Sequence, residues 1–482
     1  MTADVRGAGA SFPTARRGAS VDTVWPLLLI VLVAPLALPY GLILSIGGGP
    51  VRLAFPAYVL GCAALVLAWR KENYPAFVLA VFAFAPFLRR VADYRSGFLL
   101  TNPILVAPYI ALLPTLPSLL RQVMGHGRGS VWPFQIMLAC FVYAGFLTAF
   151  QSPSASNMFE ATRWLLPLAF GTYFIGQSSE IDVVRRQVIR AILIILPILV
   201  FYGIYQYVVA PAWEVDWMLN IGSISRAFGN PEPFKIRVYS MMNSPYSVAL
   251  WAAMGIILLS GEGLLGLVEA GAALSLLALT LVRTAWGGLA IGLLVLFIRG
   301  APSRKLLLVL GAGVFGIIGM ALLESQLVPN DVTALVISRF ETLSRLDSDY
   351  SANDRESVYD TFFSQLSDSP SGKGFGVTLS TASIAEKRNA GALDSGFLEV
   401  YLTFGVVVGT AYFVSLAAMI AEAFRASRQL RGQLAGFFAA VCCSVVVLPL
   451  GPGQSGEVGV LAWCAFGILV ATAYARRGKA AP

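Results

Sequence analysis

Three arginines have the chemistry and the sequence surroundings expected of phosphate ligands. Arg237 follows a proline-containing polar segment, Arg283 lies in a tight turn between two apolar runs, and Arg355 lies on the apolar face of a short amphipathic segment. An arginine binds two phosphate oxygens with its planar guanidinium and keeps its charge at any physiological pH. Each of these residues is therefore a candidate ligand of an anion, and Arg226 is a further candidate.

Two of these arginines also have a simpler interpretation. Arg283 suits an interfacial anchor that caps helical carbonyls, beside Trp286 in the aromatic belt of the membrane surface. Arg355 suits a long side chain that lies along an apolar face and extends its charge into water. The pattern of arginines alone leaves both interpretations open.

A glycine-rich turn follows the segment that contains Arg355. Residues 369–376 read Ser-Pro-Ser-Gly-Lys-Gly-Phe-Gly, and Gly374 and Gly376 would let backbone amides approach a phosphate. Glycine turns also end many helices, so this pattern is a weak indication of ligand binding.

Asp394 and Glu399 are the candidates for a general base. They belong to the segment Asp-Ser-Gly-Phe-Leu-Glu, where a long apolar run begins. A carboxylate there caps the following helix, or it takes a proton from a hydroxyl, with a pKa raised by partial desolvation. The single histidine, His126, lies in a short basic loop and is given no role. We expect neither a metal nor a cofactor, because no cluster of metal ligands is visible.

The composition indicates which elements must position these residues. Of the 482 residues, 57% are hydrophobic and 12% are charged, and the mean hydropathy is +0.74. A soluble domain has about a quarter of its residues charged, so the exterior of this protein must face lipid. We predict an all-α fold: a polytopic transmembrane helical bundle with a large external loop that contains short amphipathic helices.

The hydrophobic runs give the number of spans. A helix needs about 20 apolar residues to cross the hydrocarbon core, and backbone groups in lipid must be paired within it. We expect twelve to fourteen spans, near residues 25–46, 51–69, 75–91, 98–120, 131–150, 163–178, 187–210, 244–260, 263–282, 284–300, 305–325, 395–424, 433–450 and 455–475.

The basic residues give the orientation. Clusters such as Arg185/Arg186/Arg190 and Arg425/Arg428/Arg431 fall in short loops on one side, which the positive-inside rule makes cytoplasmic. We therefore expect cytoplasmic tails at 1–24 and 476–482, transmembrane helices over 25–325 with an external loop at 211–243, a large external loop at 326–394, and further transmembrane helices over 395–475. Topology accounts for the basic pI of about 9.3, so nucleic acid is not an expected partner.

Four of the segments described above occur in an informative order. Arg237 precedes Asn-Ser-Pro, Val-Arg-Thr-Ala-Trp-Gly-Gly contains Arg283, Asp-Arg-Glu contains Arg355 and precedes the glycine turn, and Asp394 opens a segment that runs to Gly409. In this order around one large loop, from about residue 222 to 410, they resemble the O-antigen ligase and Wzy-type polysaccharide polymerase superfamily of bacterial envelope enzymes. The ligases carry a histidine, their proposed base, where this chain has Asp394. This departure favours a polymerase over a ligase and leaves Asp394 and Glu399 as alternatives for the base.

The resemblance implies a glycosyltransferase of the bacterial inner membrane that makes a surface polysaccharide or exopolysaccharide. The donor would be a glycan on undecaprenyl pyrophosphate, and the acceptor would be another lipid-linked repeat unit or, for a ligase, a lipid A core. Arg237, Arg283 and Arg355 would bind the pyrophosphate and Asp394 would face the acceptor. Membrane lipids and other polysaccharide assembly or export proteins are the further partners that the resemblance implies, and family members are not thought to need a metal.

A transporter or flippase of lipid-linked sugars is the alternative from a different class. Transporters place ionisable groups near the middle of their spans, often in repeated halves. Only Glu269 lies well within a predicted span, and no internal repeat is visible. The charged residues gather in the external loops, which favours an enzyme at the membrane surface.

Overall fold

A computed structural model describes residues 21–127, 130–221, 228–299, 366–376, 395–428 and 433–480 of the chain. Within these ranges every regular element is a helix, and the only strand-like pairing is an isolated bridge between Gly229 and Ile236. The prediction of an all-α, polytopic helical bundle is confirmed. Part of the predicted large loop and the predicted span at 305–325 lie outside the described residues.

The long helices follow the predicted spans closely. In the first half of the chain they are α1 (Val21–Ile46), α2 (Gly48–Trp69), α3 (Tyr74–Ser96), α6 (Trp132–Gln151), α7 (Ala155–Gly176) and α8 (Ile181–Val209). In the second half they are α10 (Pro245–Leu259), α11 (Gly263–Thr280), α12 (Arg283–Arg299), α17 (Gly396–Arg428), α18 (Gln433–Val446) and α19 (Gly456–Ala480). A short helix, α9 (Ala212–Asn220), lies within the shorter predicted loop.

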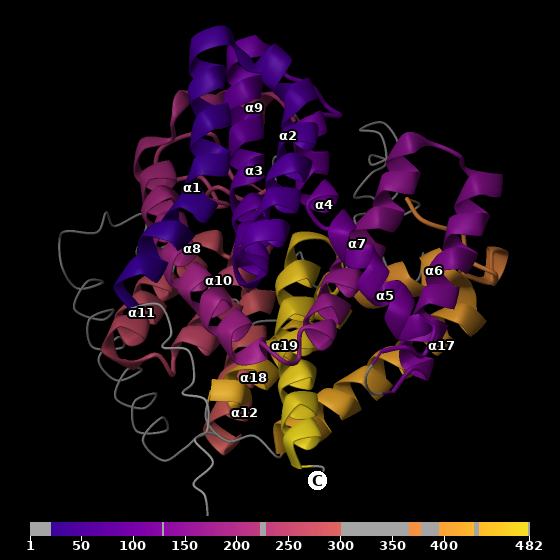
Figure 1. Ribbon diagram of the computed structural model, residues 1–482. Helices are drawn as coiled ribbons and strands as arrows, with labels where there is room; N and C mark the ends of the chain where they lie inside the picture. The colour runs from indigo at the N-terminus through magenta and orange to yellow at the C-terminus, as the bar shows by residue number, and fades with distance from the viewer. Residues whose placement is uncertain are drawn as a thin grey trace, which may run out of the picture.

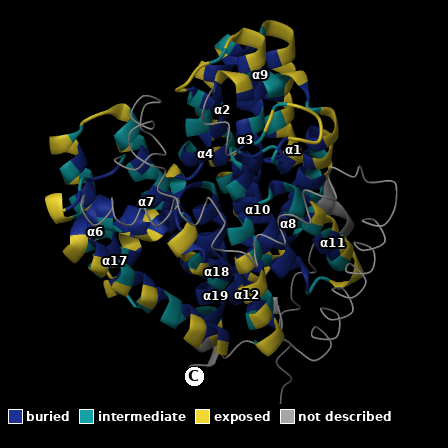
Figure 2. Ribbon diagram, turned by 180° about the vertical axis from the view of Figure 1, so that it is seen from behind, coloured by how far each residue is buried: buried dark blue, intermediate teal, exposed yellow. Residues whose placement is uncertain are grey.

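Within the part of the chain that the structure describes, eight helical segments are long and apolar enough to cross a membrane. They are Gly48–Trp69, Lys71–Ser96, Pro103–Val123, Trp132–Gln151, Ile181–Val209, Gly263–Thr280, Gly396–Arg428 and Gly456–Arg476, and Ile30–Ile46, Pro245–Leu259 and Leu434–Leu450 are shorter apolar helices. Large apolar side chains on the outer faces are strongly exposed, for example Leu53 at 77% and Phe201 at 74%. Figure 2 shows such exposed residues on the outside of the bundle around a buried interior. An apolar exterior of this kind is suited to lipid.

The span predicted at 98–120 is a broken helix. Residues 103–123 form a 3₁₀ turn (Pro103–Val106), α4 (Ala107–Ile110), a second 3₁₀ turn (Leu113–Thr115) and α5 (Leu116–Val123). Prolines stand at the starts of these pieces because a proline has no N–H to donate and is tolerated only in the first turn of a helix. The hydropathy predicted the span, and the prolines explain why it is divided.

Helix α19 lies at the centre of the bundle, and 89% of its most apolar stretch is buried inside the protein. Figure 1 shows it between α7 on one side and α18 on the other. It approaches α7 closely because both helices have glycine there: a Cβ atom on Gly467 would lie 2.3 Å from the carbonyl oxygen of Gly171. Small residues allow such close contact between helices in membranes.

Arg237, Arg283 and Glu399, three of the residues predicted to carry the chemistry, lie at one end of the bundle. Helices α3 and α11 end there, and α7, α10, α12, α17 and α19 begin there. We call it the site end. In Figure 1 it lies toward α9, opposite the end at which the C-terminus is marked.

Candidate functional site

The turn that contains Arg283 is held by hydrogen bonds within its own helices. Helix α11 ends at Thr280, and Leu281 adopts a left-handed conformation with φ 55° before α12 begins at Arg283. Thr280 Oγ1 accepts a hydrogen bond from the amide of Val282 (3.3 Å), and Trp286 Nε1 donates to the carbonyl of Leu277 (3.3 Å). A non-glycine residue in this conformation is under strain, so the turn is a fixed feature of the site end.

Arg237 lies against this same turn. Its Nε donates to the carbonyl of Thr280 (3.3 Å) and its Nη2 to the carbonyl of Leu281 (3.4 Å), and both carbonyls are at the C-terminal end of α11. A cation at this end of a helix is favoured by the helix dipole. The structure thus brings Arg237 to the segment that contains Arg283, although the two residues are far apart in the sequence.

Arg283 is the first residue of α12, at a helix N-terminus, and it is half-buried. The exposed amides of a first helical turn and the dipole behind them favour an anion at this position. The turn therefore brings Arg237 next to the start of a helix whose first residue is Arg283, and two arginines beside a helix N-terminus suit a phosphate or pyrophosphate.

The glycine-rich turn has a different environment from the one expected. Its amides already donate within the protein: that of Lys373 to the carbonyl of Leu402 (2.8 Å), that of Gly374 to Thr403 (3.0 Å), and that of Phe375 to Thr148 Oγ1 (2.7 Å). The expectation that Gly374 offers its amide to a phosphate is therefore not met in this arrangement. The phosphate-binding role of Gly376, in the same turn, stays a prediction.

The turn fills a break in a membrane helix. Helix α17 is interrupted at Gly405 (φ 78°, ψ 179°), and the carbonyls of Leu402 and Thr403 are paired with the turn instead of with the helix. The amide of Val406 donates to the carbonyl of Pro370 (3.0 Å). Since unpaired backbone groups in lipid cost several kcal/mol each, the turn stabilises the break.

We expect Gly372→Ala to destabilise the protein. A Cβ atom on Gly372, whose φ is +84°, would lie 2.4 Å from the amide nitrogen of Gly405. The left-handed conformation and the clash together should cost about 2 kcal/mol or more. Thermal unfolding of the purified protein measures this loss. Gly145→Ala is the matched control, because a Cβ atom there would meet nothing within 4 Å; equal stability of both variants would contradict the packing described above.

The predicted carboxylates are only partly described. Glu399 lies in the first turn of α17 and is 8% exposed. It is close enough to Arg163 of α7 to interact electrostatically. Ser395 Oγ accepts a hydrogen bond from the amide of Leu398 (3.3 Å), so Ser395 caps the helix. Asp394, together with Arg355 and Arg226, lies outside the described residues.

The site end also contains polar residues that the sequence analysis did not predict. Arg163 Nη1 forms an ion pair with Glu160 Oε2 (2.8 Å), one helical turn away. Glu457 lies in the first turn of α19, and its backbone carbonyl accepts a hydrogen bond from Trp251 Nε1 of α10 (2.8 Å). This contact joins the start of α19 to α10. The spacing of Glu160 and Arg163 on one helix is the signal that would have indicated the first pair.

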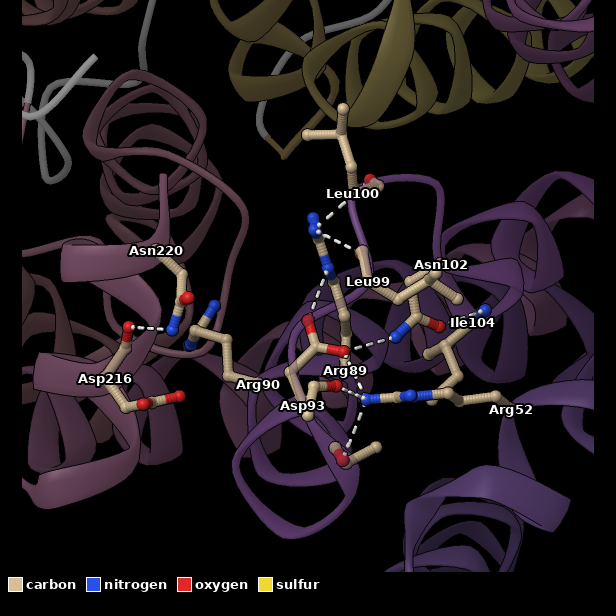
Figure 3. Close-up of polar contacts among 12 residues, drawn as sticks. Arg52, Arg89, Arg90, Asp93, Leu99, Leu100, Asn102, Ile104, Asp216 and Asn220 are labelled. Atoms are coloured by element: carbon tan, nitrogen blue, oxygen red, sulfur yellow. Dashed lines mark hydrogen bonds and ion pairs between the residues drawn. The ribbon is translucent and has the colours of Figure 1, made fainter. Parts of the chain in front are cut away.

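A second unpredicted cluster lies at the end of α3. Arg52 and Arg89 both pair with Asp93, at 2.7 and 3.2 Å, and Asn102 Nδ2 donates to the same carboxylate (2.8 Å). Figure 3 shows these side chains converging on Asp93, while Arg90 points toward α9. The cluster fixes the connection that follows α3, because Arg89 also donates to the carbonyl of Leu99 (3.2 Å).

Comparison with known proteins identifies part of the chain. Residues 270–414 match the Wzy_C family model, described as O-antigen ligase. The match begins in α11, includes the turn at Arg283, and extends into α17 beyond its break at Gly405. No curated protein matches the chain. The chain therefore carries an O-antigen ligase (Wzy_C) domain, as members of the O-antigen ligase and Wzy-type superfamily do.

Proposed function

We propose that this protein is a polymerase that joins oligosaccharide repeat units carried on undecaprenyl pyrophosphate, at the external face of the bacterial inner membrane. The observation that carries the proposal is the position of Arg237 against the turn that leads into Arg283. This turn lies within the segment that matches O-antigen ligases. Both termini would be cytoplasmic, in agreement with the distribution of basic residues.

The proposed reaction transfers the growing glycan from one lipid carrier to another. A hydroxyl oxygen of the acceptor sugar attacks the anomeric carbon of the donor, and the bond from that carbon to the pyrophosphate breaks. The leaving pyrophosphate takes the bonding electron pair, so its negative charge grows in the transition state. Arg237 and Arg283 stabilise this charge, with Arg355 contributing from the large loop. A carboxylate takes the proton of the hydroxyl, with Asp394 as the first candidate and Glu399 as the second.

A ligase is the second candidate function, because the matching family model is that of O-antigen ligase. The two reactions use the same donor and differ in the acceptor. The ligases carry a histidine, their proposed base, where this chain has Asp394. The single histidine of this chain, His126, follows α5 in a short loop and is distant in sequence from that position, so the polymerase is favoured. Other polysaccharide assembly or export proteins are the partners that a polymerase would require.

The pool of lipid-linked glycans in a strain that lacks this protein tests the proposal. We expect single repeat units to accumulate on the lipid carrier at the external face, with no polymer. Long chains that remain on the carrier would indicate a ligase. Repeat units that accumulate only at the cytoplasmic face would indicate a transporter and would overturn the proposal.

A further inference from the structure

Arg90 occupies an unusual position among the buried arginines of the site end. It is next to Arg89 on α3, but the two side chains point in different directions, as Figure 3 shows. Arg89 pairs with Asp93 on its own helix, whereas Arg90 pairs with Glu214 of α9: Nε and Oε2 are 2.7 Å apart. The Arg90 residue is 1% exposed and Glu214 is fully buried. Arg90 therefore connects α3 with parts of the chain that follow much later.

The rest of the Arg90 guanidinium binds the backbone that follows Arg237. Nη1 donates to the carbonyl of Met242 (2.8 Å) and Nη2 to the carbonyl of Ser240 (2.5 Å). The guanidinium also lies over the ring of Tyr239, 5.0 Å from its centroid. A planar fork that binds two carbonyls fixes the path of this backbone in a way that a single ammonium cannot.

Glu214 is the centre of the same network. It accepts hydrogen bonds from the hydroxyl of Tyr239 (3.0 Å) and from the hydroxyl of Tyr202. Burial raises the pKa of Tyr239 well above its usual value, so its hydroxyl stays protonated and remains a donor. Both members of the ion pair thus have further partners: Arg90 binds backbone carbonyls, and Glu214 binds tyrosine hydroxyls.

The backbone held by this network is strained. Ser240 has φ 50°, a left-handed conformation that is unfavourable for a non-glycine residue. Gln206 Oε1 accepts hydrogen bonds from the amides of Tyr239 (3.1 Å) and Ser240 (2.8 Å), and Ser240 Oγ donates to the carbonyl of Leu199 (2.6 Å). Strain of this kind persists only where the surroundings determine the conformation.

The strained segment is joined directly to Arg237. The amide of Val238 donates to the carbonyl of Leu279 (3.1 Å), so the chain is pinned to the end of α11 on one side and to Arg90 on the other. Replacing a buried ion pair by apolar residues of similar volume is often neutral for stability, so stability alone does not account for this arrangement. Resting on the proposed function, we infer that Arg90 and Glu214 are positioning residues that hold Arg237 at the pyrophosphate site.

The test measures binding of inorganic pyrophosphate to the purified full-length protein in lipid nanodiscs. Arg90→Lys keeps the charge opposite Glu214 but loses the fork, so we expect the dissociation constant to rise about tenfold. Arg89→Lys is the matched control, because Arg89 is also buried on the same helix but donates its hydrogen bonds to Asp93 and to the carbonyls of Leu99 and Leu100. We expect its dissociation constant to equal that of the wild type. Glu214→Gln should weaken binding in the same direction as Arg90→Lys.

A double-mutant cycle separates positioning from a general effect on folding. If Arg90 acts through Arg237, Arg90→Lys adds no further loss in the Arg237→Lys background. If the double variant loses as much affinity for pyrophosphate as the two single losses multiplied, the inference is overturned. It is also overturned if Arg90→Lys and Glu214→Gln both bind pyrophosphate like the wild type. Neither result would contradict the arginine site itself. If the wild type does not bind pyrophosphate, or if Arg237→Lys binds it normally, the phosphate site of the proposed function fails and the inference fails with it.

Discussion

Replacing Arg283 with alanine or lysine is expected to stop polymer formation while the protein remains in the membrane. Arg283 begins α12 at the turn that Arg237 contacts, where the charge of the leaving pyrophosphate would develop. Loss of one group that stabilises such charge typically lowers a rate by about 10²–10³-fold. Lysine keeps the charge but cannot bind two phosphate oxygens at once. The measurements are the polymer made by cells and the amount of protein in the membrane fraction.

The helix itself should tolerate these substitutions. A positive side chain at a helix N-terminus is unfavourable toward the helix dipole, so its removal should change stability by no more than about 1 kcal/mol. Arg299→Lys is the matched control on the same helix, because Arg299 lies at the other end of α12 and donates to Ser427 Oγ (2.6 Å). We expect this control to make polymer normally. Full activity of both Arg283 variants would show that Arg283 does not stabilise the leaving pyrophosphate.

The helices were predictable because each membrane helix is a continuous run of apolar residues in the sequence. Each predicted span within the described residues coincides with a helical segment, since lipid requires a long apolar run and internally paired backbone. The breaks at proline within residues 103–123 were not predicted, because a proline-containing apolar run can have the same mean hydropathy as an unbroken one. Hydropathy therefore gives the number of crossings better than their shape.

Contacts between distant segments were predictable only where both segments had recognisable motifs. The meeting of Arg237 with the turn at Arg283 was expected, because each residue stands where the chain returns to the membrane. The break at Gly405 was not expected, because its partners are the carbonyl of Pro370 and the amides of Lys373 and Gly374. Those residues were interpreted as a phosphate-binding turn, and a single sequence does not show that a helix elsewhere needs their hydrogen bonds.

The buried ion pairs were missed for a related reason. Arg90 stands at the end of a predicted span, where an arginine has the same sequence surroundings as an interfacial anchor. Its role depends on Glu214 and on the carbonyls of Ser240 and Met242, which belong to a different part of the chain. Pairing of this kind depends on the packing of α3 against α9, and the sequence around Arg90 does not show which distant helix packs there.

Asp394→Asn is expected to lower the rate of polymerisation by about 10²-fold, the contribution usual for a general base. The alternative role for Asp394 was to cap α17, but Ser395 already accepts the hydrogen bond from the amide of Leu398 (3.3 Å). A capping residue is thus present without Asp394, which favours the base. Glu399→Gln should have a smaller effect, because Glu399 is 8% exposed and lies near Arg163, where its charge supports the packing of α17 against α7.

The pH dependence distinguishes the two carboxylates. A base works only when it is deprotonated, so the wild-type rate should fall as the pH falls through the pKa of the base. In the variant that lacks the base, the remaining rate should lose this dependence, whereas a variant with only a packing defect keeps it. Asp394→His should retain activity with the fall moved toward the pKa of an imidazole, since imidazole is a base in its own right. If Glu399→Gln loses the dependence and Asp394→Asn keeps it, the proton goes to Glu399, and the buried position of that carboxylate beside Arg163 becomes the acceptor side of the site.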